Sequence, residues 1–129
     1  MKLDIDLNDV LKFLENNKDS NISAGSELTN KKVIVRSRNA GVLYGTLKRL
    51  SNNYVLLENA RLIWRWRTAN GGIALNDVAL GGIKDDNYSH LSCVNSKIEI
   101  LDACSIIEVS ECAQRSLDDR TAYDRGKDD

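Results

Sequence analysis

The sequence predicts an α+β fold: a single domain with an antiparallel β-sheet core, short flanking helices and an appended N-terminal amphipathic helix. Apolar and polar residues alternate across residues 32–67, in runs separated by turn-forming Asn, Gly and Ser, which is the pattern of half-buried strands. The chain has 129 residues, a hydrophobic fraction of 42% and a charged fraction of 29%. These values are typical of one globular domain with one core.

An amphipathic helix is predicted over residues 6–17, within an N-terminal segment at residues 1–18. Apolar residues recur there at helical spacing, and Asp6 or Asn8 can cap the start of the helix. The apolar stripe consists of Leu3, Leu7, Val10, Leu11 and Leu14. Residues 19–30 are rich in Asn and Ser and form a predicted linker. We interpret the helix as an appendage that serves oligomerisation, and we expect a homo-oligomer.

The core domain at residues 31–117 begins with four predicted strands of an antiparallel meander. The turn-forming segments Asn-Ala-Gly at 39–41 and Ser-Asn-Asn at 51–53 separate the first three strands. The four predicted strands are residues 32–36, 42–50, 54–57 and 62–67.

Short helices and strands are predicted for the second part of the core domain. A helix at residues 73–80 is ended by the Gly81–Gly82 pair, and Ser110 can cap a helix that runs through residues 111–117. Residues 118–129 are almost all polar, so they form a predicted acidic tail that is either mobile or docked on a partner. The further predicted strands are residues 88–94, 97–101 and 105–109.

No membrane segment or secretory signal is predicted, because apolar runs are short and the N-terminus interleaves acids with apolar residues. We therefore expect a cytoplasmic protein with no membrane partner. The three cysteines, Cys93, Cys104 and Cys112, lack the spacing of a zinc site. We expect them to be small core or half-buried residues, with a reactive thiol as the alternative.

Basic residues concentrate in residues 31–67, which carry nine Lys and Arg residues and a single acid, Glu58. The flanking segments are acidic, so the net charge is −1 and the pI is near 5.8. Both tryptophans, Trp64 and Trp66, lie in the same stretch. A cationic surface with aromatic residues suits a phosphate-bearing or otherwise anionic ligand. The basic residues are Lys31, Lys32, Arg36, Arg38, Lys48, Arg49, Arg61, Arg65 and Arg67.

Strand alternation places the arginines Arg61, Arg65 and Arg67 on one face and the two tryptophans on the other. Arginine offers a planar set of donors that matches phosphate oxygens and stacks on flat rings. The alternative reading makes the tryptophans core residues and the arginines a solvated face. We favour the core for the tryptophans, and both readings stay open for the arginines.

A second basic segment is the turn Arg-Ser-Arg-Asn-Ala-Gly at residues 36–41, where Gly41 would let backbone N–H groups approach an anion. A plain turn is the favoured reading. The nucleotide-binding patterns G-x-x-x-x-G-K-[ST] and G-x-G-x-x-G do not occur. His90 is the single histidine, and a lone histidine is more often a hydrogen-bonded structural residue than a base. We expect no enzyme, no catalytic residues, no cofactor and no metal.

Three motifs carry a resemblance to known proteins: Val-Ile-Val-Arg at 33–36, Ala-Gly-Val at 40–42 with Gly-Thr-Leu at 45–47, and Ala-Arg-Leu-Ile-Trp-Arg-Trp at 60–66. Over residues 32–117 the chain resembles a group of small, poorly characterised phage and prophage proteins. In size and character it is also similar to phage anti-defence proteins that sequester nucleotide signals of bacterial immunity, including the Thoeris anti-defence sponges.

This resemblance implies an oligomer that binds cyclic ADP-ribose isomers or cyclic oligonucleotides without cleaving them, in the cytoplasm of an infected bacterial host. It implies phosphate ligands at Arg36, Arg61, Arg65 and Arg67 and an aromatic such as Trp66 or Tyr88 stacked on adenine. The chain departs from the group at residues 68–72, Thr-Ala-Asn-Gly-Gly, where the resemblance leads us to expect an alanine-rich segment.

The leading hypothesis is therefore a non-enzymatic sponge for a small anionic nucleotide. One alternative is a phage protein that inhibits a host protein through the N-terminal helix. The other is a small RNA- or DNA-binding β module, which the pI disfavours because polymer-binding domains usually have a pI above about 9. The candidate ligand contacts are Arg36, Arg38, Arg61, Arg65, Arg67, Trp66, Tyr88 and His90.

Overall fold

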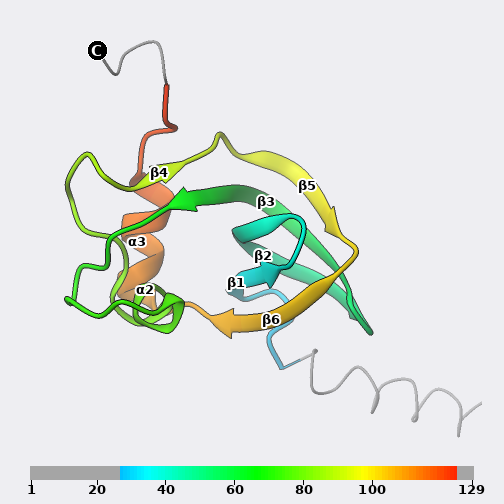
Figure 1. Ribbon diagram of the computed structural model, residues 1–129. Coiled ribbons are helices and arrows are strands. Elements are labelled where there is room, and N and C mark those ends of the chain that lie inside the picture. Colours follow the sequence, from blue (N-terminus) through cyan, green and yellow to red (C-terminus); the bar gives the residue numbers. More distant parts are fainter. Residues whose placement is uncertain (1–26, 125–129) are drawn as a thin grey trace, which may run out of the picture.

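Six antiparallel strands form one sheet in the computed structural model, which describes residues 27–124 (Figure 1). In chain order they are β1 (Lys32–Ser37), β2 (Gly41–Ser51), β3 (Tyr54–Arg65), β4 (His90–Leu91), β5 (Asn95–Ile100) and β6 (Ala103–Glu108). Their spatial order is β4-β3-β2-β1-β6, and β5 pairs with the first part of β3. Within this range two helices accompany the sheet, α2 (Leu75–Gly81) and α3 (Glu111–Asp119). The predicted α+β class with a sheet core is confirmed.

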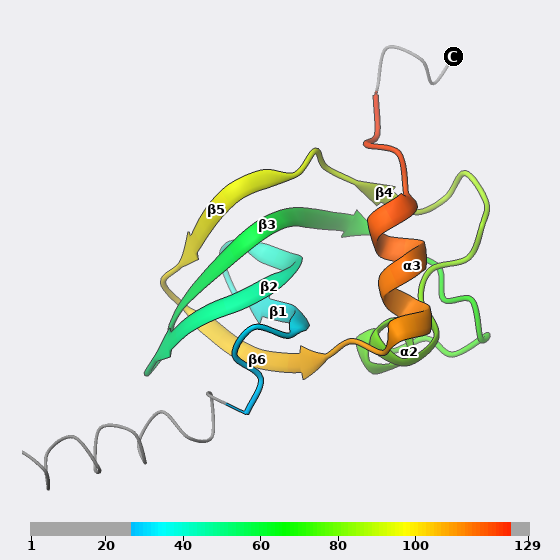
Figure 2. The same ribbon diagram turned by 180° about the vertical axis from the view of Figure 1, so that it is seen from behind.

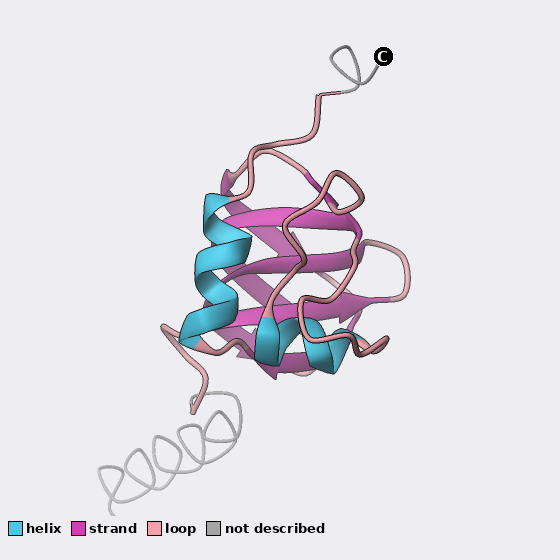
Figure 3. Cartoon of the chain, turned by 90° about the vertical axis from the view of Figure 1, so that its left-hand side faces the viewer, coloured by secondary structure: helices cyan, strands magenta, loops and turns pink. Residues whose placement is uncertain are grey.

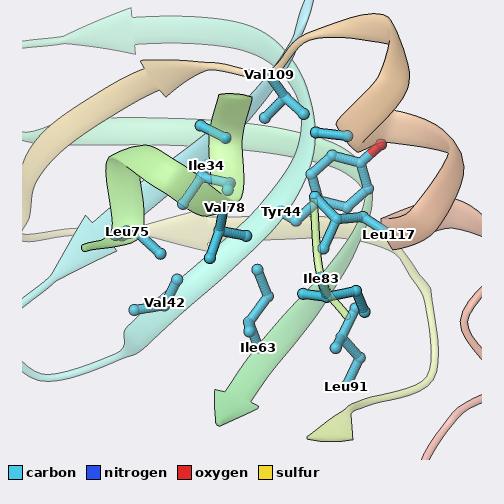
Figure 4. Close-up of a cluster of buried hydrophobic side chains, with 12 residues drawn as sticks. Ile34, Val42, Tyr44, Ile63, Leu75, Val78, Ile83, Leu91, Val109 and Leu117 are labelled. Atoms are coloured by element: carbon cyan, nitrogen blue, oxygen red, sulfur yellow. The ribbon is translucent and has the colours of Figure 1, made fainter. Parts of the chain in front are cut away.

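Both faces of the sheet are buried, because the helices cover one face (Figure 3) and the sheet curves around the other. The helix-side core (Figure 4) consists of Ile34, Val42, Tyr44, Ile63, Leu75, Val78, Ala79, Ile83, Leu91, Val109, Ala113 and Leu117. The interior core consists of Val33, Val35, Leu43, Leu47, Val55, Leu57, Ala60 and Ile100. A strand buried on both faces is apolar at successive positions, which explains the Val-Ile-Val run of β1.

The turn between β5 and β6 closes the curve of the sheet (Figure 2). The Ala103 N–H donates to the Asn53 carbonyl in the β2–β3 turn at 2.9 Å. The Asp102 carboxylate accepts a hydrogen bond from the Ser37 hydroxyl at the end of β1. Because β6 then pairs with β1, the two edges of the sheet are brought together by a turn of two residues.

The strands predicted at residues 54–57 and 62–67 are one continuous strand, β3. Its pairing with β2 shifts where Asn59 and Ala60 lie opposite the single residue Gly45, and Asn59 has a φ of 50°. This is a β-bulge, in which one extra residue changes which side chains face the core. The predicted break between the two strands, residues 58–61, therefore contains this bulge.

The two helices predicted in the core domain are present as α2 and α3, with their end signals. The Ser110 hydroxyl accepts a hydrogen bond from the Ala113 N–H at 3.1 Å at the start of α3. Gly82 follows α2 with a φ of 86°, in the region that glycine tolerates best. The strand predicted at residues 88–94 is much shorter, since β4 contains only His90 and Leu91.

The N-terminal helix predicted at residues 6–17 and most of the linker at 19–30 lie outside the described residues. The predicted tail boundary at residue 118 falls inside α3, which ends at Asp119. Asp118 accepts a hydrogen bond from the buried Tyr44 hydroxyl at 2.9 Å, so the start of this segment is packed on the domain.

Two predictions about burial are wrong. All three cysteines are exposed free thiols rather than core or half-buried residues. Cys93 lies in the loop between β4 and β5, and α3 buries Ala113 and Leu117 rather than Cys112. Trp64 is 63% exposed, and only Trp66 packs partly against the helix-side core. No helix in the described part of the chain is long and apolar enough to cross a membrane.

Candidate functional site

Arg61 is buried and takes a structural role, which corrects its prediction as a phosphate ligand. It is 3% exposed and lies on the face of β3 that α3 covers. Its Nε donates to the Ser92 carbonyl at 2.8 Å, and one terminal nitrogen donates to the carbonyls of Leu117 and Arg120 at 3.0 and 2.8 Å. Since the last carbonyls of a helix attract cations, Arg61 fixes the C-terminal end of α3 against the sheet. Burial lowers the pKa of the guanidinium, and nearby Asp118 opposes that change.

Arg65 and Arg67 are exposed and share one aromatic ring. Their guanidinium carbons lie 4.5 and 4.4 Å from the centroid of the Tyr88 ring. Cations within about 6 Å of a ring face are attracted by its electron density. Two like charges are thereby held beside one ring at the end of β3, which is the core of the candidate site.

Hydrogen bonds orient Arg65 without neutralising it. Its Nε donates to the Tyr88 carbonyl at 2.8 Å, and a terminal nitrogen lies 3.3 Å from Nε2 of His90. Arg67, by contrast, forms an ion pair with Asp86 at 3.2 Å. Within residues 27–124, no carboxylate forms an ion pair with Arg65.

Asp86 organises the loop that presents Tyr88. Its carboxylate accepts a hydrogen bond from the Tyr88 N–H at 3.0 Å as well as the bond from Arg67. The bond from the Tyr88 N–H and the Arg67 charge together hold the pKa of the Asp86 carboxyl below its usual value, against an opposing effect of burial. Tyr88 is thereby fixed relative to Arg67 by a backbone contact.

His90, Trp64 and Tyr123 place three rings next to Arg65. The Tyr123 ring is stacked on His90 with centroids 3.7 Å apart and an interplanar angle of 14°. Trp64 lies 5.5 Å from His90 and 5.9 Å from Tyr123. We call Trp64, Arg65, Arg67, Tyr88, His90 and Tyr123 the arginine–aromatic cluster.

An open groove of about 790 Å³ borders this cluster, between the 83–90 segment and the end of α3. Its lining includes His90 and Tyr123 from the cluster, together with Arg115 and Arg120. Arg120 is anchored there, because its guanidinium donates to the carbonyls of Asp86 and Ser89. Among the described residues, no three His, Cys, Asp or Glu side chains gather so as to hold a metal.

The β1–β2 turn does bind an anionic group, but that group belongs to the chain itself. The Asn39 N–H and side-chain amide donate to the Asp102 carboxylate at 3.1 and 2.7 Å. Arg36 and Arg38 are exposed on this hairpin and form none of the contacts that build the arginine–aromatic cluster within the described range. These two predicted ligand residues therefore lie apart from those in the arginine–aromatic cluster.

Comparison with known families gives one match. Residues 30–117 match the family described as Domain of unknown function (DUF6948). The chain belongs to this family. The DUF6948 match contains residues 32–117, where the chain resembles a group of poorly characterised proteins. The prediction that the chain belongs to a poorly characterised family is therefore confirmed. No curated protein matches the chain.

The extent of the DUF6948 domain separates the cluster into two parts. Arg65, Arg67, Tyr88 and His90 fall within the matched residues, whereas Tyr123 follows them. Tyr123 was missed as a site residue because residues 118–129 are otherwise polar. It is the only aromatic residue in that stretch, and this was the signal available to find it.

The cluster brings together four of the eight predicted ligand residues. Arg65, Arg67, Tyr88 and His90 meet in one place. Trp66 does not join them, since it packs on the helix-side core, and Trp64 takes the exposed position instead. The register of β3 against β4 shifts between Ile63 and Arg65, so strict alternation fails for these tryptophans.

Proposed function

We propose that this domain binds a small phosphate-bearing nucleotide at the arginine–aromatic cluster and holds it without cleaving it. The observation that carries the proposal is Arg65, an exposed guanidinium oriented by Tyr88 and His90. It forms no ion pair with a carboxylate in the described part of the chain. An arginine that is already oriented loses little side-chain entropy on binding.

Arg67 and Tyr88 support the same ligand chemistry. The Tyr88 ring lies against both guanidiniums, so a phosphate that approaches Arg65 also meets the charge of Arg67. Charge-assisted hydrogen bonds from arginine to phosphate oxygens are roughly twice as strong as neutral ones. Hydrogen bonding and stacking are what these side chains supply, and they serve recognition of an anion.

The finer form of the proposal comes from the resemblance to anti-defence proteins. In that form the domain is phage-encoded and sequesters an immune signal of the cyclic ADP-ribose or cyclic oligonucleotide type, as a homo-oligomer in the host cytoplasm. The phosphates of such a signal would take the positions beside Arg65 and Arg67. The match to a domain of unknown function indicates neither a phage origin nor a nucleotide ligand, so both are part of the proposal.

Titration of the purified chain with cyclic ADP-ribose isomers and cyclic di- and trinucleotides tests the proposal. We expect Arg65→Ala to weaken binding by about tenfold or more, because a hydrogen bond to a charged group contributes about 1.5–3 kcal/mol. Arg36→Ala is the matched control, since Arg36 is an exposed arginine on β1 outside the cluster. Mass spectrometry of the released ligand should recover it unchanged.

Equal loss of affinity in Arg65→Ala and Arg36→Ala would contradict this assignment, as would cleavage of the ligand. No binding of any of these nucleotides would overturn the proposal as a whole.

The exposure of Trp64 beside Arg65 favours a second candidate, a single-stranded RNA- or DNA-binding module. In such modules an exposed aromatic stacks on bases while arginines follow the backbone. The salt dependence of binding separates the two candidates. A polymer loses affinity steeply with salt, by about one unit of logarithmic slope for each neutralised phosphate, whereas a small ligand held by one or two arginines loses much less.

A further inference from the structure

The closest ring contact in the cluster is made by a residue beyond the DUF6948 match. Tyr123 covers one face of His90 at 3.7 Å, nearly parallel to it, while Trp64 lies beside both rings. Parallel stacking at this distance is the contact that aromatic side chains make with nucleic-acid bases. A planar base in the place of the Tyr123 ring would make the same contact with His90.

His90 itself has unused hydrogen-bonding capacity. It is 5% exposed, and its Nδ1 has no hydrogen-bond partner within the described residues. Its Nε2 is engaged near the Asn87 carbonyl and the Arg65 guanidinium, at 3.2 and 3.3 Å. A buried polar atom without a partner is unfavourable. His90 also lines the groove beside the cluster.

The segment that carries Tyr123 lies at the edge of the domain. Arg120 is held in place at both ends. Its carbonyl accepts a hydrogen bond from Arg61, and its guanidinium donates to the carbonyls of Asp86 and Ser89. Beyond it the Tyr123 N–H donates to the Leu91 carbonyl of β4 at 2.9 Å, and the chain then leads away from the domain (Figure 1). The neighbours of Tyr123 at positions 121, 122 and 124 are exposed. Displacement of the Tyr123 ring from His90 would involve this exposed segment, with Arg120 still in place.

We propose that His90 and Trp64 form a stacking site for the planar base of a nucleotide, and that Tyr123 fills this site in the ligand-free chain. The inference rests on the proposed function, because Arg65 would hold the phosphate of the same ligand. Arg65 contacts His90 at 3.3 Å and lies 5.9 Å from the Trp64 ring, so the two subsites are adjacent. One nucleoside monophosphate unit supplies both groups.

The test compares AMP with ribose 5-phosphate, which lacks the base, on the full chain and on Tyr123→Ala. Removal of the competing ring should tighten AMP binding by about tenfold, within the range that stacking of one base contributes. Binding of ribose 5-phosphate should be unchanged. Tyr123→Phe is the matched control, because it keeps the ring and should bind AMP as the native chain does.

A second measurement uses the native chain and needs no substitution. The Tyr123 ring protons lie over His90, so AMP should shift their NMR signals toward those of a tyrosine free of ring contacts. Unmoved signals at saturating AMP would overturn the inference.

The outcomes separate the inference from the proposed function. If Arg65→Ala weakens AMP binding but Tyr123→Ala leaves it unchanged or weaker, the stacking site is wrong and the phosphate site stands. If Tyr123→Ala tightens AMP binding and Arg65→Ala has no effect, the stacking site stands and Arg65 is not the phosphate ligand. Absence of AMP binding to both the native chain and Tyr123→Ala would overturn the stacking site, while the proposed function would still be decided by the titration with cyclic nucleotides.

Discussion

Arg61 and Arg65 lie four residues apart on β3 and carry the same charge, but their surroundings differ. Arg61 is enclosed between the sheet and α3, and its Nε and one terminal nitrogen donate to backbone carbonyls. Arg65 is exposed at the strand end, where its guanidinium meets a ring and a histidine. The bulk of α3 makes the difference, because it covers β3 at Arg61 and leaves the strand end open.

Replacement of Arg61 tests this structural role. We expect Arg61→Ala to lower the free energy of unfolding by about 3 kcal/mol, because it leaves one buried and two partly buried carbonyl acceptors without their donor. Urea unfolding followed by circular dichroism measures the change. Arg36→Ala, at an exposed position, should stay within about 0.5 kcal/mol of the native chain. A loss below about 1 kcal/mol for Arg61→Ala would show that water replaces the guanidinium at little cost.

At the scale of elements, the bulge in β3 decides which residues meet the cores. Leu57 before it and Ala60 after it both lie in the interior core, although three positions separate them. Without the extra residue, strand alternation would place Ala60 on the opposite face. The bulge therefore also determines that Arg61 and Ile63 face α3.

Gly45 permits this bulge, and its replacement should weaken the sheet. A Cβ at position 45 would lie 2.7 Å from the Ala60 Cβ and 2.9 Å from the Ala60 Cα. We expect Gly45→Ala to destabilise the domain by about 1–3 kcal/mol through overpacking, measured by thermal unfolding.

Ala60→Gly supplies the matched test, because it removes one of the two atoms in that contact. The double variant should be less destabilised than the sum of the two single changes. Strictly additive effects would mean that the close approach of Gly45 and Ala60 is not the cause.

Local pattern was enough to predict most elements but not the bulge. The hairpin of β1 and β2, the Gly82 stop of α2 and the Ser110 cap of α3 each depend on neighbouring residues and were predicted. The site was predicted where the residues are close in sequence, as for Arg65 and Arg67. The burial of Arg61 could not be predicted, since its acceptors at Leu117 and Arg120 follow it by more than 50 residues. Stacking of Tyr123 on His90 is non-local in the same way.

At the scale of the whole molecule, Asp102 connects two turns that are far apart in sequence. Ser37 and Asp102 are 65 residues apart, and their hydrogen bond joins the β1–β2 turn to the β5–β6 turn. The Ser37 hydroxyl, followed by the Asn39 donors, lowers the pKa of the Asp102 carboxyl, against an opposing effect of burial. The hydrogen bonds that join the two turns therefore stabilise the charged form of Asp102 in the folded chain.

Because the pKa of Asp102 is lowered in the folded chain, the free energy of unfolding depends on pH. The unfolded chain takes up the Asp102 proton first on acidification, so the contribution is present above the ordinary value near 3.8 and is lost as pH falls below it. Urea unfolding between about pH 2 and pH 7 should therefore show a steeper acid loss for the native chain than for Asp102→Asn. Asp86 contributes equally to both chains, so the difference isolates Asp102, and parallel curves would contradict the assignment.

Pairing of β1 with β6 also bears on how quickly the domain can form. Ile34 pairs with Ile107, so the last strand to emerge during synthesis completes the ladder of the first. Closing such long chain loops costs entropy before any contact is gained, and domains dominated by non-local strand pairs fold in milliseconds to seconds. Until β6 arrives, the outer edge of β1 has unpaired N–H and C=O groups. A nascent chain that pauses before Ala103 therefore presents an open strand edge to its neighbours, and that edge is where misassembly of this domain would begin.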